Sequence, residues 1–138
     1  MRFLVSIPVL LAVLAANPLS IAHAEDCFSN AVTQGAMNAC ANEAYEKSDA
    51  ELNALYKQIL KRLKNDTDAT QRLVSAQMAW IAFRDAECTF VTSPFTGGSV
   101  YPMVVSFCHE RLTRARVNDL KSYLRCKEGD VTCPLPPQ

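Results

Sequence analysis

Six cysteines constrain the fold of this chain more than any other feature, and all lie beyond residue 26: Cys27, Cys40, Cys88, Cys108, Cys126 and Cys133. An even number of dispersed cysteines in an exported chain favours disulfide bonds over metal ligands. None of them forms a C-x-x-C pair, so a zinc site would have to be built from distant thiols and His109. We therefore expect three disulfides, no metal ion and no cofactor.

Residues 1–24 read as a secretory signal peptide. A positive start at Met1-Arg2 is followed by an apolar run over residues 3–15 and by the small-x-small site Ala22-His23-Ala24. The apolar run is broken at Asn17-Pro18 and is shorter than the roughly 20 residues that a membrane span needs. No lipobox-like cysteine follows it. We expect cleavage after residue 24, no stable membrane insertion afterwards, and a periplasmic or secreted product.

The remaining residues predict one domain. Removing residues 1–24 from the 138 leaves 114, which is enough for a modest core, with a helical domain over residues 25–126 and a proline-rich tail over 127–138. Without Arg2 there are 13 basic and 14 acidic residues, so bulk charge selects no partner and nucleic-acid binding is not expected. The charges are nevertheless uneven along the chain, with Glu43, Glu46, Asp49 and Glu51 early and Arg111, Arg114, Arg116, Lys121, Arg125 and Lys127 late. We interpret them as facing surfaces of adjacent helices, with a binding patch as the alternative.

Apolar periodicity predicts an all-α fold of three long helices in an up-down-up bundle. The first is expected over residues 35–64 with the stripe Leu52, Leu55, Tyr56, Ile59, Leu60 and Leu63. A turn over residues 65–68 precedes a second helix with Leu73, Ala76, Gln77, Trp80, Arg84 and Cys88 on one face, widened by Ile81 and Phe83. Two prolines and a Gly-Gly pair predict a loop over 92–102, and the third helix is expected over 103–125.

This topology limits how the cysteines pair, because alternate helix ends meet at each pole of the bundle. Cys126 and Cys133 fall at one pole and should pair with each other. Three pairings remain possible for the other four cysteines, Cys27, Cys40, Cys88 and Cys108. We choose the sequential pairing, Cys27 with Cys40 and Cys88 with Cys108. A Cys88–Cys108 bond would stabilise the fold by roughly 3 kcal/mol through loop closure.

The search for a catalytic constellation finds none, so the chain is not expected to be an enzyme. A hydrolase triad would need His109 beside a nucleophile, yet the cysteines are expected to be oxidised and no serine has nucleophile-elbow context. Acidic pairs such as Asp85 with Glu87 are typical of solvated helix faces. Gly97-Gly98 lacks the lysine of a phosphate-binding loop.

Several polar side chains lie within otherwise apolar helix faces, where burial would require partners. Arg84 is expected to pair with a carboxylate such as Asp49, while Asn53 and Gln77 would bridge helices through amide hydrogen bonds. We interpret the set as a structural network that fixes helix register, with a ligand site as the alternative; its members are Asp49, Asn53, Tyr56, Gln77, Trp80, Arg84 and Arg116.

Two signatures carry a resemblance: Asp49-x-Glu51-Leu52-Asn53-x-x-Tyr56 and Gln77-x-x-Trp80-Ile81-x-Phe83-Arg84-Asp85-x-Glu87-Cys88. Together with Cys40, Gly97-Gly98-Ser99, Cys108 and Thr113-x-x-Arg116-x-x-x-Leu120 they resemble the bacterial lysozyme-inhibitor LprI-like family over about residues 27–124. The resemblance implies an exported helical domain with disulfides and, for a lipoprotein member, inhibition of lysozyme. This chain departs from that member by lacking a lipobox and by carrying Cys126 and Cys133.

The leading hypothesis is an exported envelope binding protein whose protein partner is a lysozyme or another muramidase. A loop held at Cys88 and Cys108 would enter the enzyme's cleft at little ordering cost, with Phe95, Gly97, Gly98, Ser99 and Tyr101 as its contact residues. An equally weighted interpretation is that the loop's aromatic residues pack on the bundle end. The alternative function is a non-inhibitory periplasmic interaction or scaffold module.

Overall fold

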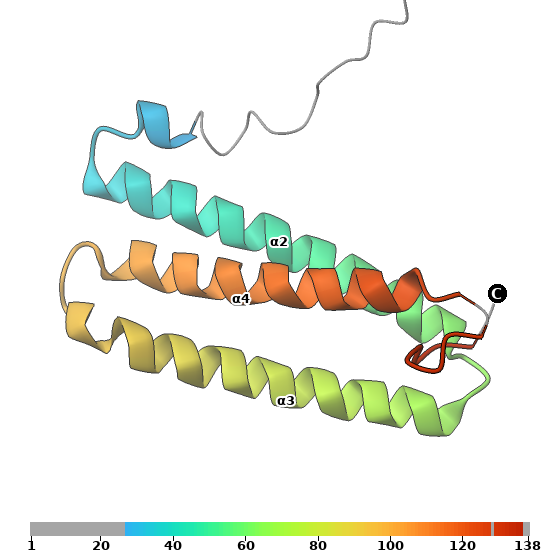
Figure 1. Cartoon of the computed structure of the whole chain (residues 1–138). Coiled ribbons are helices and arrows are strands. Elements are labelled where there is room, and N and C mark those ends of the chain that lie inside the picture. Colours follow the sequence, from blue (N-terminus) through green and yellow to red (C-terminus); the bar gives the residue numbers. More distant parts are fainter. Residues whose placement is uncertain (1–26, 128, 137–138) are drawn as a thin grey trace, which may run out of the picture.

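The computed structural model describes residues 27–127 and 129–136, so the predicted signal peptide, residues 1–24, lies outside the described residues. Three long helices follow one another: α2 (Gln34–Arg62), α3 (Thr67–Thr92) and α4 (Tyr101–Leu124), with a short 3-10 helix η1 (Ser93–Phe95) after α3. They run up, down and up, and α4 lies between α2 and α3 (Figure 1). No strand occurs in the part of the chain that the structure describes. The predicted all-α fold is confirmed.

Local chemistry sets the helix ends. The Thr33 side chain accepts a hydrogen bond from the Ala36 amide at 3.1 Å, and the Asp66 carboxylate accepts one from the Ala69 amide at 2.9 Å, so both helices are capped at their N-termini. The third helix was expected to begin at Met103 but begins at Tyr101. Proline suits the first turn of a helix, where no intrahelical partner is lost, so Pro102 lies inside α4 rather than before it.

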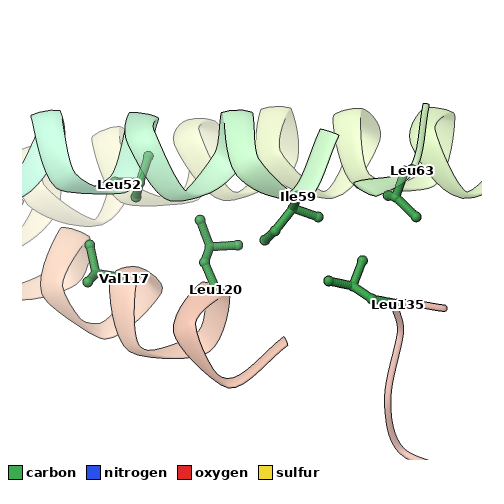
Figure 2. Close-up of a cluster of buried hydrophobic side chains, with 6 residues drawn as sticks. All are labelled: Leu52, Ile59, Leu63, Val117, Leu120 and Leu135. Carbon is green, nitrogen blue, oxygen red and sulfur yellow. The ribbon is translucent and has the colours of Figure 1, made fainter. Parts of the chain in front are cut away.

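The apolar core is formed mainly between α2 and α4. Leu52 and Ile59 of α2 form one buried cluster with Val117 and Leu120 of α4, and Leu63, which directly follows α2, extends it (Figure 2). Leaving these side chains in water would forfeit about 1.5–3 kcal/mol each.

The proline-rich tail closes this core from the far end. Leu135 is only 6% exposed and lies in the same cluster (Figure 2). Arg62 holds the returning chain by donating to the carbonyls of Leu124 at 3.2 Å and Pro136 at 2.7 Å. Residues 127–138 were treated as a tail separate from the helical domain, but Leu135 is one of the core side chains.

Helix α3 is packed less extensively than predicted. Ile81 and Phe83 were expected to widen its buried face, but they are 39% and 55% exposed. The buried side chains of α3 are Gln77, Arg84, Cys88 and Thr92. Because α4 covers only one side of α3, apolar residues on its other sides remain in solvent (Figure 1).

The six cysteines form disulfides between successive partners in the chain. Cys27–Cys40 ties a helical turn at residues 27–30 to α2, Cys88–Cys108 joins α3 to α4, and Cys126–Cys133 closes the tail on the end of α4. The Cα atoms in each pair are 5.4–5.7 Å apart, which is ordinary disulfide spacing. This is the sequential pairing chosen from the sequence.

The expected charge complementarity between the first and last helices is present in part. Lys121 of α4 lies 2.6 Å from the Glu51 carboxylate of α2. Other basic residues pair within α4 itself, as Arg114 does with Glu110. No helix among residues 27–127 and 129–136 has both the length and the hydropathy to cross a membrane.

Candidate functional site

A groove of about 390 Å³ lies between α2 and α3, on the side where these two helices face each other. We call it the α2/α3 groove. Its walls carry both signatures found in the sequence. The lining residues are Tyr45, Asp49, Leu52, Asn53 and Tyr56 from α2, and Val74, Gln77, Met78, Trp80, Ile81 and Arg84 from α3. The structure therefore brings six of the seven predicted network residues to one place, and Arg116 reaches the same place from α4.

Arg84 is the centre of the groove. It is 9% exposed, and its Nη1 lies 3.6 Å from Asp49 Oδ1 while its Nη2 lies 2.8 Å from Asp85 Oδ1. Its Nε also donates to Asp85 at 2.9 Å. The expected ion pair with Asp49 is present, but the closer partner is the neighbouring Asp85. The two bonds to one carboxylate fix the plane of the guanidinium, which a lysine could not reproduce.

Two aromatic rings accompany this guanidinium. Its Cζ lies 5.2 Å from the centre of the Trp80 ring and 5.7 Å from that of Tyr45. Both distances fall in the range of cation–π attraction, worth about 0.5–1 kcal/mol at partly exposed sites. Arg84 is therefore held by rings from α2 and α3 as well as by carboxylates, and it connects α3 to α2.

The two amides of the network have different roles. Gln77 Oε1 accepts a hydrogen bond from Arg116 Nε at 3.2 Å, which links α3 to α4 as expected. Asn53 was also expected to bridge helices, and this is wrong: its Nδ2 donates to Asp49 Oδ2 at 2.8 Å within α2. Four residues separate Asn53 from Asp49, so both face the same way and meet without a second helix. Tyr56 is half-buried and packs against the apolar core.

Tyr45 and His109, whose ring centres lie 5.2 Å apart, join this cluster but were not among the predicted network residues. Burial raises the pKa of Tyr45, and the positive charge of Arg84 opposes this rise. Burial lowers the pKa of His109 below its ordinary 6.5, and Arg84 lowers it further, while Asp85 at 3.8 Å opposes both. The lowered pKa favours the neutral imidazole of His109. One signal was available: Tyr45 lies one helical turn before Asp49 and so shares its face.

This arrangement favours a structural role for the network. The groups of the groove mostly satisfy one another, and they connect α3 to α2 through Asp49 and to α4 through Arg116. Among the described residues, no cluster of three or more histidine, cysteine, aspartate or glutamate side chains could hold a metal ion.

The predicted contact loop lies at the pole of the bundle next to Cys88–Cys108. We call residues 93–100 the 93–100 loop. Phe95 is 44% exposed, and Gly97 has a φ of +83°, a conformation that glycine adopts at no steric cost. The Asn38 side chain on α2 donates to the Ser99 carbonyl at 3.0 Å. Tyr101 was assigned to the same surface, but it belongs to α4 and is half-buried.

The loop was interpreted either as an exposed contact surface or as a connection whose aromatic residues pack on the bundle end, and each interpretation describes one aromatic residue. Phe95 projects into solvent, and Tyr101 packs on the bundle. The structure brings Phe95, Gly97, Gly98 and Ser99 together as one exposed surface.

Comparison with known proteins agrees with this architecture. The sequence profile of the family described as "Lysozyme inhibitor LprI" matches residues 25–120. An uncharacterized protein of Rhizobium meliloti (strain 1021), R02472, is 36% identical over 115 residues, which covers 75% of this chain and 82% of that protein. A crystal structure of a DUF1311 family protein from Pseudomonas putida KT2440 has the same fold, with a TM-score of 0.60 and 23% identity over 67% of this chain and 95% of that one. On the match over residues 25–120 and on the relative from Rhizobium, this chain belongs to the LprI family.

Proposed function

We propose that this protein is exported and inhibits a lysozyme-type muramidase, and that the 93–100 loop enters the enzyme's cleft. Export is supported by the signal-like start and by three disulfides, which persist in oxidising compartments. Inhibition is supported by membership of the family described as "Lysozyme inhibitor LprI". In this proposal the protein binds its target and is not an enzyme.

The observation that carries the proposal is an exposed loop whose conformation is already fixed. The Cys88–Cys108 bond closes its base, and the Asn38 side chain ties it to α2. Within it, the Gly98 amide donates to the Phe95 carbonyl at 3.0 Å and the Tyr101 amide donates to the Gly98 carbonyl at 3.1 Å. A loop ordered before binding loses little conformational entropy on binding, which raises affinity.

Phe95 supplies the anchor in this proposal. Exposed aromatic side chains that enter a pocket are frequent hot spots of protein interfaces. Glu43 and Glu46 are exposed on the N-terminal half of α2, the half from which Asn38 reaches the loop. A cationic muramidase would therefore meet negative charge at the same end of the bundle as the apolar contact, which accelerates association.

The test is a dose-response of the oxidised protein against cell-wall lysis by a panel of c-type, g-type and bacterial muramidases. We expect stoichiometric inhibition by the wild type and a loss of at least about tenfold in potency for Phe95→Ala, as for a hot-spot residue. Val131→Ala is the matched control, because Val131 is a fully exposed apolar side chain in the tail. Unchanged potency of Phe95→Ala would refute the loop as the contact. Lack of inhibition across the panel would refute the inhibitor function.

One observation favours the second candidate, a non-inhibitory interaction module of the cell envelope. Several large apolar side chains are exposed along α3, among them Met78, Phe83 and Phe90. Such side chains are typical of protein contact surfaces when they are contiguous. This function predicts binding of a partner with no change in the rate of any muramidase.

A further inference from the structure

Helix α3 has an apolar stripe on the side opposite its packed face. Its members are separated by four, three and four residues, and all are exposed: Ala79, Phe83, Ala86 and Phe90. Phe83 is 55% exposed and Phe90 is 75% exposed. We call these four residues the α3 stripe. Gln77, Arg84 and Cys88, which are buried against the rest of the protein, lie on the other side of the helix.

The spacing of the α3 stripe is that of the seam of a coiled coil. Apolar residues that alternate at intervals of three and four keep one side of a helix facing a partner helix over several turns. Three helix turns of such a seam, with no charged residue in it, are left without a neighbour in the described structure. A single exposed phenylalanine would need no explanation, whereas a regular seam predicts a helical partner.

The sizes of the side chains identify that partner. In an antiparallel pairing of two copies of α3 about a twofold axis between residues 84 and 85, Phe83 of one copy lies level with Ala86 of the other, and Phe90 lies level with Ala79. Every phenylalanine then meets an alanine, so large and small side chains alternate across the seam as dense packing requires. A parallel pairing would place phenylalanine on phenylalanine and alanine on alanine.

We propose that the α3 stripe binds a second copy of this chain, forming an antiparallel twofold dimer. One patch serves both subunits, as it must in a twofold interface. Residues 77–92 of each copy overlap, a length of about 24 Å. Glu87 is the charged residue beside the seam, and it lies level with Ala82 of the second copy, so no like charges meet. This proposal is independent of muramidase inhibition.

The test is the association of the purified, oxidised protein measured by analytical ultracentrifugation over a wide range of concentration. We expect a concentration-dependent dimer. Phe83→Ala leaves alanine facing alanine, and Ala86→Phe makes two phenylalanines meet, so each single change should weaken association at least about tenfold. The double variant Phe83→Ala/Ala86→Phe exchanges large and small across the seam and should restore association toward the wild-type level.

Phe95→Ala is the matched control, because it removes an exposed phenylalanine outside the stripe and should leave association unchanged. Circular dichroism establishes that each variant is folded, which is expected because all substituted side chains are exposed. A protein that stays monomeric at every concentration would overturn the proposal. So would a dimer insensitive to stripe substitutions, or a double variant as weak as its two single changes combined.

Discussion

Removing the Cys88–Cys108 bond is the perturbation whose effect follows most directly from the structure. The bond closes a loop with a sequence separation of 20 residues, so its loss returns about 3.3 kcal/mol of conformational free energy to the unfolded chain. Cys88 is 1% exposed and Cys108 is 7% exposed, so replacing both sulfurs also removes packed atoms. A domain of this size has roughly 5–15 kcal/mol of stability, and the loss is therefore a large fraction of the total.

The assay is urea unfolding of Cys88→Ala/Cys108→Ala followed by far-ultraviolet circular dichroism. With a slope of about 1.5 kcal/mol/M, the midpoint should fall by about 2 M. The comparison is Cys27→Ala/Cys40→Ala, which removes a bond with a sequence separation of 13 that holds one helical turn outside the core. Its loss should lower the free energy of unfolding by at most about 2.9 kcal/mol. A loss below about 1 kcal/mol for the first variant, or a larger loss for the second, would refute the reasoning.

Three further predictions concern the core, the groove and pH. Leu135→Ala should lower the free energy of unfolding by about 2–4 kcal/mol in urea titration, whereas Val131→Ala in the same tail should change it by less than about 0.5, because only Leu135 is buried. Arg84→Ala should cost about 1–2 kcal/mol in the same titration, since Asp85 and Asp49 are partly solvated and recover water; an unchanged midpoint would contradict its role in attaching α3. His109 has a lowered pKa in the folded protein, so below pH 6.5 the unfolded chain binds the proton more readily than the folded one. The free energy of unfolding therefore decreases as the pH is lowered from 6.5 to the pKa of His109 in the folded protein. His109→Gln should lose less stability between pH 7.5 and 5 than the wild type, and parallel slopes for the two proteins would refute this.

The helices themselves could be predicted because their signals are local. Leu52, Ile59 and Leu63 repeat at helical spacing and are buried together, and Asp66 caps the next helix as its position suggests. Helix boundaries deviated by one or two residues. Pro102 was read as ending the loop, although the same residue is well suited to opening a helix.

The buried face of α3 could not be chosen from the sequence. Apolar residues lie on nearly every side of this helix, and its buried side includes the polar Gln77, Arg84 and Thr92. Periodicity identifies a face only when the opposite face is polar, so Phe83 was placed inside although it lies outside. The regular seam that Phe83 belongs to became visible only when exposure was known.

The sequence predicted which residues line the α2/α3 groove better than it predicted which of them contact one another. Asp49 and Arg84 were expected to pair because a buried guanidinium needs a carboxylate, and they do. Asp85 binds the same guanidinium more closely, which depends on a rotamer that sequence spacing does not specify. Leu135 was missed because the return of a proline-rich segment onto a core depends on tertiary packing. The role of the 93–100 loop in binding stays a prediction.

The order of the disulfides along the chain also bears on how the protein acquires them. Each cysteine is bonded to the next one in sequence, so the three covalent rings follow one another and none encloses another. When a chain enters an oxidising compartment with its N-terminus first, each free thiol meets its native partner before any later cysteine arrives. Simple oxidation in order of arrival then produces the native set, and no incorrect bond has to be reduced and exchanged. For the export proposed above, maturation of this protein should accordingly need a thiol oxidase and no disulfide isomerase.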